Sequence, residues 1–341
     1  MNTEERPELD KSEVVARMPK ACSDETAAVE FFEQQRWGDK PTCPHCKSAD
    51  VYKMTDRDGT RNKRYLWRCR GCGEQYTVRI GTVYEESRLP LRHWAFAFWR
   101  ACASKKGVSA REIQRICQIS YKSALFLMHR IRFAVTETDE QFQVKLGGEG
   151  QTVEIDETYC GGVPRPQAFG APKRKRYQGK GYRSDSNKVP VIAMLERGGG
   201  IRTKVVPNVT QRNVQQFIRE NVATRSIVNT DQSVMYPSVL WPIIKHEGGR
   251  HDVVNHAKKE YARHNPDGTV SHVNCCESFF SLLKRGLMGT FHAVSKEHLH
   301  RYASEFAFRW DTRKFNDGQR IVAAIQRGEN KRLTYENYVA R

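Results

Sequence analysis

Four cysteines in two C-x-x-C pairs constrain the fold of this chain more than any other feature. The pairs are Cys43 with Cys46 and Cys69 with Cys72. A tight turn brings each pair of thiolates within about 2.3 Å of one ion, so the spacing predicts a tetrahedral Cys₄ zinc site. Four protein ligands leave no open position, which makes this zinc structural. Buried thiols that bind no metal are the alternative, and His45 could replace one cysteine.

Three acidic stretches lie further along the chain. Residues 153–158 and 227–231 are short β-branched runs that carry Asp156 and Asp231, and a third stretch with helical apolar spacing carries Glu277. If these carboxylates converge, they offer the hard oxygen ligands that Mg²⁺ prefers. Two such ions about 3.5–4 Å apart can activate a water or a 3′-hydroxyl for in-line phosphoryl displacement. The pattern predicts a metal-dependent polynucleotidyl transferase.

The third stretch predicts a helix that begins near Asn274. Asn274, Glu277, Ser281 and Lys284 then share one face, while apolar residues fill the other. We expect Glu277 to face the metals and Lys284 to bind a phosphate. An ordinary amphipathic helix with a surface glutamate and lysine is the alternative.

The charge of the chain points to a polyanionic partner. Lys and Arg number 57 against 39 Asp and Glu, a formal net charge of +18. Nucleic acid is the commonest partner for such an excess, although a merely soluble basic protein is possible. No run approaches the 18 or so apolar residues that span a bilayer, and the N-terminus lacks an apolar signal core. We therefore expect an intracellular protein without membrane attachment, whose ten cysteines serve as metal ligands and buried thiols.

Helical patterns between residues 88 and 136 predict a helix-turn-helix region. An apolar, aromatic helix covers residues 91–103, a second begins at Ser109, and a turn at 118–120 leads into a third over 121–133. The polar side of the third helix can face the major groove of DNA. Its predicted DNA contacts are Lys122, Arg130 and Arg132. A helical hairpin used for packing or for a dimer contact would show the same spacing.

Strands and helices alternate after this region. Residues 189–196 and 201–206 predict a hairpin around three glycines, residues 211–222 a helix capped by Thr210, and residues 226–231 the next strand. This order indicates a mixed α/β domain. A sheet with carboxylates at its strand ends and a helix closing over them matches a ribonuclease-H-like arrangement, although composition alone would not select it.

A basic run interrupts the predicted sheet. Residues 172–183 contain no acidic residue, so we expect them to grip DNA phosphates rather than act only as a solvated loop. The predicted contacts are Lys173, Arg174, Lys175 and Arg176, together with Lys284 and Arg285 of the third acidic stretch.

These motifs resemble those of bacterial insertion-sequence transposases of the DDE class with an N-terminal zinc ribbon. The motifs are Val-Glu-Ile-Asp-Glu-Thr-Tyr-Cys-Gly-Gly at 153–162, Asn-Thr-Asp at 229–231 and His-Val-Asn-x-x-Glu-Ser-Phe-Phe-Ser-Leu-Leu-Lys-Arg-Gly at 272–286. The similarity extends from about residue 27 to residue 314. It implies a ribonuclease-H-like catalytic domain, terminal inverted-repeat DNA as substrate, and metal-dependent strand cleavage followed by strand transfer.

By this resemblance, the catalytic acids and magnesium ligands are Asp156, Asp231 and Glu277. They would hold two Mg²⁺ ions, which Mn²⁺ could replace. Members of the group can carry asparagine in the third role, so Asn274 is the alternative to Glu277. An anionic oxygen offsets the charge of Mg²⁺ better than an amide, which favours Glu277. In a strand, Glu154 shares a face with Asp156 and is expected to support the site, whereas the neighbouring Glu157 points the other way.

The predicted organisation is a polar lead-in (1–24), an N-terminal helix and zinc ribbon (25–85), the helix-turn-helix region (88–136), a catalytic domain (150–315) and a C-terminal tail (316–341). Transposases hold two DNA ends together, so a homodimer or larger assembly on double-stranded DNA is expected, in the cytoplasm at the nucleoid. Rival hypotheses are a DNA-binding regulator, a domesticated transposase that no longer cuts, and a Holliday-junction or ribonuclease-H-type nuclease. The histidines at 246, 251, 256, 264 and 272 match no standard zinc pattern.

Overall fold

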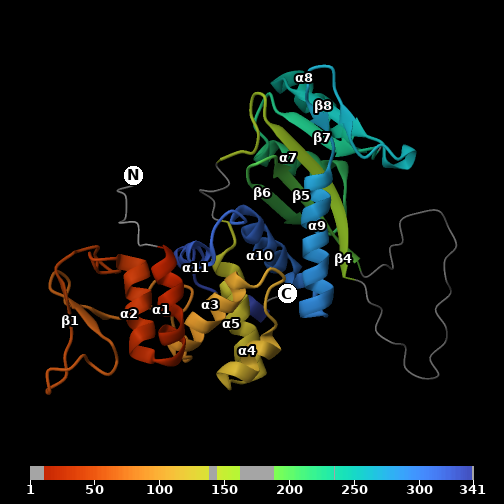
Figure 1. The fold of residues 1–341 in the computed structure, drawn as a ribbon. Coiled ribbons are helices and arrows are strands. Elements are labelled where there is room, and N and C mark those ends of the chain that lie inside the picture. The colour runs from red at the N-terminus through yellow and green to blue at the C-terminus, as the bar shows by residue number, and fades with distance from the viewer. Residues whose placement is uncertain (1–10, 138–143, 162–187, 234, 340–341) are drawn as a thin grey trace, which may run out of the picture. The chain divides into compact units, whose positions relative to one another are not determined.

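The computed structural model describes residues 11–137, 144–161, 188–233 and 235–339. The chain divides into two compact units (Figure 1). Unit 1 combines Met1–Thr136 with Thr312–Arg341, and unit 2 is Glu137–Asp311. Unit 2 is therefore inserted into unit 1 along the chain.

Unit 1 consists of helices and a small antiparallel sheet. Its helices are α1 (Lys11–Ser23), α2 (Glu25–Trp37), α3 (Leu91–Ala103), α4 (Ala110–Cys117), α5 (Tyr121–Ala134), α11 (Asp317–Gln326) and α12 (Tyr335–Val339). Its three strands, β1 (Val51–Lys53), β2 (Trp67–Cys69) and β3 (Gln75–Tyr76), pair in the order β1-β2-β3.

The two ends of unit 1 differ from the sequence prediction, which assigns them a polar lead-in and a polar tail. Helix α1 buries Val14 and Met18, and α11 buries Ile321 and Ile325. Helix α11 packs against α1, α2 and α3. The apolar residues of α1 are few, and Pro19 lies inside that helix, which weakens its helical pattern in the sequence.

Helices α4 and α5 are separated by the three residues 118–120. Ser109 caps α4 by accepting a hydrogen bond from the Glu112 N–H, and Ser120 caps α5 in the same way from Ser123. Gln118 ends α4 in a left-handed conformation, with φ of 51°. These caps satisfy N–H groups that have no partner within the helix.

Unit 2 contains a five-stranded mixed sheet in the order β6-β5-β4-β7-β8. The strands are β4 (Thr152–Gly161), β5 (Lys188–Glu196), β6 (Ile201–Val205), β7 (Ile227–Asp231) and β8 (Arg250–Val254). Strand β5 is antiparallel to both neighbours, while β4 with β7 and β7 with β8 are parallel. A short hairpin, β9 (Arg263–His264) with β10 (Val270–Ser271), follows β8. The predicted mixed α/β layout is confirmed.

Helices cover both faces of this sheet. Helices α7 (Gln211–Asn221) and α8 (Met235–Glu247) pack with Val153 and Ile155 of β4 on one face. Helices α9 (Asn274–Gly286) and α10 (Leu299–Asp311) pack on the other face with Cys160. Short η segments, η1 (His256–Lys258), η2 (Leu287–Phe291, π-helical) and η3 (Lys296–His298), join these elements. Because strand residues alternate between faces, the even-numbered residues of β4 lie under α9.

Candidate active site and zinc centre

The four predicted zinc ligands come together in unit 1. The Sγ atoms of Cys43, Cys46, Cys69 and Cys72 all lie within 4.8 Å of one another. The Cys43–Cys72 and Cys46–Cys69 sulfur pairs are 3.7 Å and 3.5 Å apart. A tetrahedron with Zn–S bonds of about 2.3 Å has edges of about 3.8 Å. The sulfur positions therefore fit one tetrahedral zinc ion.

The two cysteine turns have matching backbone hydrogen bonds. In each, the residue four after the first cysteine donates to that cysteine's carbonyl, from Lys47 to Cys43 and from Gly73 to Cys69. Both donors have left-handed backbone angles, with φ of 65° and 77°. Glycine adopts this region without strain, whereas Lys47 does so at some cost. Helix α2 secures the ribbon because its buried Glu33 accepts a 2.7 Å hydrogen bond from the Trp67 indole.

Asp156 and Asp231 lie side by side in unit 2. Strand β4 pairs in parallel with β7 from Thr152 to Ile155, and Ile155 faces Thr230. Asp156 and Asp231 are the next residue on each strand, where this pairing ends. Asp231 ends β7, but Asp156 lies in the middle of β4 rather than at its end, because β4 continues along β5 to Gly161.

The third acid comes from α9, which runs beside β4 (Figure 1). The charges of Asp231, Glu157 and Glu277 all act on Asp156. Burial, followed by these neighbouring charges, raises the pKa of Asp156 to about 8, although a hydrogen bond from the Glu157 N–H acts in the opposite direction. Burial also raises the pKa of Asp231, although the charge of His256 lowers it. The three carboxylates are thus electrostatically coupled, although their oxygens do not all lie within 4.8 Å, as the four sulfurs do.

Two observations describe this acidic cluster further. The Oδ1 atom of Asp231 is buried and has no hydrogen-bond partner among the described residues. The Glu277 side chain is 48% exposed, and His256 Nδ1 lies 3.5 Å from its Oε1. Asn274 is also exposed on the same helix. Uncompensated, partly buried negative charge of this kind is what a divalent cation neutralises.

Glu154 fixes the N-terminus of α9. It is fully buried on the face of β4 that carries Asp156. One of its oxygens accepts hydrogen bonds from the Cys275 and Cys276 N–H groups at 2.8 Å and 3.3 Å, and the other accepts from Arg197 Nε at 2.7 Å. A carboxylate at a helix N-terminus satisfies free N–H groups and the helix dipole. Glu154 therefore positions Glu277, which lies on the first turn of α9.

Other side chains around the acidic cluster come from strands, helices and loops that the fold brings together. Arg197 also donates to the carbonyls of Val270 and His272, so it connects the hairpin to Glu154. Glu157 points to the opposite face of the sheet, as predicted, and accepts a hydrogen bond from the buried Tyr236 hydroxyl of α8. Only the tertiary fold brings Arg197 and Tyr236 to the site, and local sequence patterns give no indication of their role.

The predicted DNA contacts separate into three groups. Lys122, Lys284 and Arg285 are exposed. Arg130 and Arg132 are buried, with 4% and 1% exposure, which contradicts their prediction as groove contacts. Arg130 instead donates to the Glu85 carbonyl and lies over the Trp94 ring, where burial lowers the pKa of its guanidinium to about 10. Lys173, Arg174, Lys175 and Arg176 lie outside the described residues.

Comparison with known sequences finds a family match within each unit. The ISXO2-like transposase domain matches residues 145–311, and the transposase zinc-ribbon domain matches residues 23–75. The chain belongs to the DDE-class insertion-sequence transposases with an N-terminal zinc ribbon. This DNA transposase therefore carries its acidic cluster inside the family's transposase domain and its four cysteines inside the family's zinc-ribbon domain. An archaeal relative supports the assignment. This relative is a protein of Halobacterium salinarum described as an uncharacterized protein in transposable element ISH50, and the two sequences are 28% identical over 292 residues. The match covers 84% of this chain and 90% of that protein.

Solved structures of a transposase give a more distant comparison. The Mos1 strand transfer complex matches 62% of this transposase and 73% of that chain at 10% identity, with a TM-score of 0.23. A pre-cleavage Mos1 transpososome matches 94% and 98% at 11% identity, with a TM-score of 0.25. The sequence matches, not these superpositions, carry the family assignment. Within the described part of the transposase, no helix is both long and apolar enough to cross a bilayer.

Proposed function

We propose that this transposase cleaves DNA at the terminal inverted repeats of its element and joins the freed 3′ ends to target DNA at a single site. Asp156, Asp231 and Glu277 form that site, in a domain of the ribonuclease-H-like type. The observation that carries the proposal is the convergence of three carboxylates, two from adjacent parallel strands and one from the helix above them. That arrangement fits the ribonuclease-H-like assignment made from the sequence.

These residues fit a pair of Mg²⁺ ions, for which Mn²⁺ could substitute. The unpartnered Asp231 Oδ1 and the raised pKa of Asp156 both describe negative charge that lacks compensation. When bound, the cations would supply positive charge to the attacking and leaving oxygens of the phosphodiester. Asp156, Asp231 and Glu277 would hold them, and Asn274 is the alternative third residue on the same exposed face.

The remaining side chains position the site and the DNA. Glu154 and Arg197 hold α9 so that Glu277 faces β4. Lys284, exposed further along α9, lies near enough to β4 for its charge to act on Cys160, and it would bind a phosphate of the same strand. Cleavage and strand transfer are both in-line displacements, so one site serves both without a covalent protein intermediate.

Unit 1 would recognise the DNA ends. Zinc held by the four cysteines would keep the ribbon folded. Helix α5, with Lys122 exposed near its N-terminus, would approach the groove in the manner of a recognition helix. A dimer or larger assembly would hold two ends together on double-stranded DNA.

The test is a nicking assay with labelled terminal-repeat duplex and Mg²⁺. Asp156→Ala is expected to reduce cleavage and strand transfer to background while end binding persists, because the acid acts in chemistry rather than in recognition. Glu277→Gln and Asn274→Ala separate the two candidates for the third role, and the true ligand is the one whose loss abolishes cleavage.

Two outcomes would contradict the proposal. Strand transfer that survives Asp156→Ala would remove this residue from the reaction. Wild-type protein that binds the repeat but never nicks it with Mg²⁺ or Mn²⁺ would indicate a transposase that only binds. Glu220→Gln serves as a control for nonspecific loss, because this half-exposed residue pairs with Lys204 and lies on α7, which packs on the opposite face of the sheet from α9.

A further inference from the structure

The segment that joins β8 to the β9–β10 hairpin presents an aromatic pair beside the acidic cluster. His256, in η1, lies 3.5 Å from Glu277 and acts electrostatically on Asp231. The Tyr261 ring packs against the His256 ring, with centroids 5.5 Å apart and planes inclined by 40°. Tyr261 itself is 59% exposed. One aromatic surface therefore leads from the carboxylates to solvent.

Basic side chains flank this aromatic pair. Lys258 and Lys259 are exposed, and within the described chain neither ammonium group has an ion-pair partner. The nearest acid along the segment, Glu260, is already engaged: it accepts from the Asn255 N–H at 3.0 Å and pairs with Arg263 at 3.5 Å. The uncompensated charge of the segment is thus positive and lies next to the aromatic rings.

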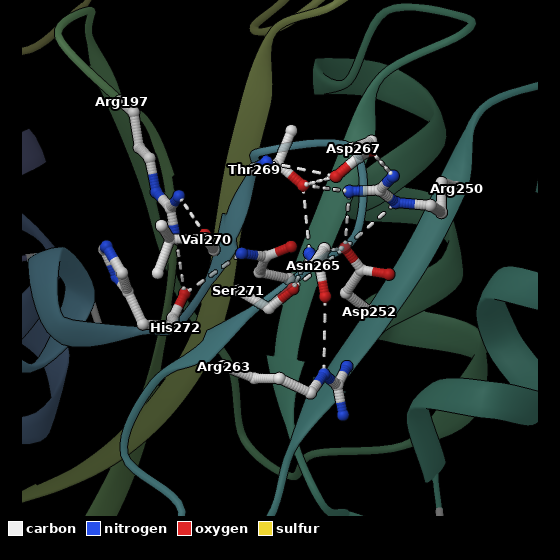
Figure 2. Close-up of polar contacts among 11 residues, drawn as sticks. Arg197, Arg250, Asp252, Arg263, Asn265, Asp267, Thr269, Val270, Ser271 and His272 are labelled. Carbon is white, nitrogen blue, oxygen red and sulfur yellow. Dashed lines mark hydrogen bonds and ion pairs between the residues drawn. The ribbon is translucent and has the colours of Figure 1, made fainter.

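The backbone of this segment is held at both ends. Asn255 caps η1, because its side chain accepts from the Lys258 N–H at 3.1 Å. At the other end, the hairpin is fixed to β8 by the hydrogen-bond network in Figure 2. There Asn265 donates to Ser271 at 2.7 Å, Ser271 donates to Asp252 at 2.9 Å, and Asp252 accepts from Arg250 at 3.0 Å. A surface ordered before binding loses little conformational entropy when it takes a ligand.

We propose that Tyr261, supported by His256, is a stacking platform for an unpaired nucleobase of the DNA strand in the active site, with Lys258 and Lys259 bound to that strand's phosphates. This inference deepens the proposed function and depends on it for the identity of the strand. An exposed aromatic face flanked by free lysines matches single-stranded nucleic acid, whose bases offer π faces and whose backbone is anionic. A base inside the duplex has both faces covered, so only an unpaired base can use the platform.

The test uses two terminal-repeat duplexes in Mg²⁺-free buffer. One is fully paired, and the other carries a single unpaired 2-aminopurine beside the scissile phosphate. Wild-type protein is expected to bind the unpaired duplex about tenfold more tightly and to quench the 2-aminopurine fluorescence, since base–aromatic stacking is of that order. Tyr261→Ala should bind the two duplexes equally and should not quench the 2-aminopurine fluorescence. Tyr261→Phe should keep both the tighter binding of the unpaired duplex and the quenching.

Two further variants separate stacking from general effects. Trp241→Ala removes an aromatic of α8 that is 68% exposed and should leave preference and quenching intact. Lys258→Ala with Lys259→Ala should weaken binding of both duplexes equally and reduce the slope of log affinity against log salt by roughly 0.7–0.9 per lysine. Preference and quenching that survive Tyr261→Ala, or that Trp241→Ala abolishes, would overturn the inference. If wild-type protein also fails to cleave with Mg²⁺, the proposed function fails separately, because these binding measurements need no cleavage.

Discussion

At Asp156, burial and repulsion from neighbouring carboxylates act in the same direction. This residue is partly enclosed by β4 and α9, and it faces the charges of Asp231, Glu157 and Glu277. Its pKa rises from 3.8 to about 8. The folded state therefore keeps a proton that the unfolded chain releases between about pH 4 and pH 8, so the free energy of unfolding falls as pH rises through this window. The carboxylate charge that a metal ion would neutralise thus opposes the stability of the metal-free fold.

Asp156→Asn should reduce this pH dependence. In Mg²⁺-free buffer at pH 8, the variant is expected to be more stable than wild type by about 2–5 kcal/mol, whereas at pH 4 the two should be nearly equal. Thermal unfolding at both pH values measures the difference. Added Mg²⁺ should stabilise wild type at pH 8 but not the variant. An advantage of the variant over wild type that is no larger at pH 8 than at pH 4 would contradict the electrostatic account.

At the scale of elements, the sequence predicted those parts whose pattern is local. The hairpin of β5 and β6, helix α7 with its Thr210 cap, and the exposed face of α9 all follow from side-chain spacing and capping. Helix α8 was not predicted, because Pro242 lies inside it and a proline ordinarily ends a helical pattern.

In the candidate site, too, the residues with a local sequence pattern were predicted and those without one were not. Its three acids lie in recognisable motifs, so the sequence named them. Arg197 and His256 reach the acids only through the tertiary fold and carry no local pattern of their own. Arg130 was misassigned because the sequence does not show which face of a helix packs against other elements. The polar side of α5 that carries Arg130 contacts Trp94 and Glu85 instead of facing solvent.

The attachment of α9 to β4 yields a prediction at this scale. Glu154→Gln should raise the Mg²⁺ concentration needed for half-maximal cleavage and reduce cleavage about 10–100-fold, because the helix that carries Glu277 loses its charged anchor. A Mg²⁺ titration of cleavage measures this shift, which a loss of folded protein alone would not produce. Glu220→Gln is the matched control: Glu220 forms a 3.6 Å pair with Lys204 that is about half exposed and contributes little. An unchanged Mg²⁺ dependence in Glu154→Gln would exclude the positioning role.

At the scale of the whole molecule, unit 1 is built from two separated stretches of chain. Helix α11 packs on α1, α2 and α3 and supplies Ile321, which is fully buried. Part of the core of the N-terminal stretch is therefore supplied by residues that follow unit 2 in the chain. This dependence explains why a tail with little apparent pattern is folded.

Ile321→Ala should lower the free energy of unfolding of unit 1 by about 2–5 kcal/mol, as expected for a buried isoleucine in a core that relaxes only partly. Urea unfolding followed by the fluorescence of the unit 1 tryptophans measures the change. Phe315→Ala, at a position with 43% exposure in the same segment, should change it by less than about 1 kcal/mol. Equal effects of the two substitutions would mean that α11 does not stabilise unit 1.

The insertion of unit 2 also sets an order of events on the ribosome. Synthesis proceeds at about 5–20 residues per second, so the 175 residues from Glu137 to Asp311 take on the order of ten seconds or more to emerge. During that interval α11 has not yet been synthesised, so the part of the unit 1 core that α11 covers remains exposed to solvent. In each newly made copy, the five-stranded sheet of unit 2 can therefore fold before unit 1 completes its core.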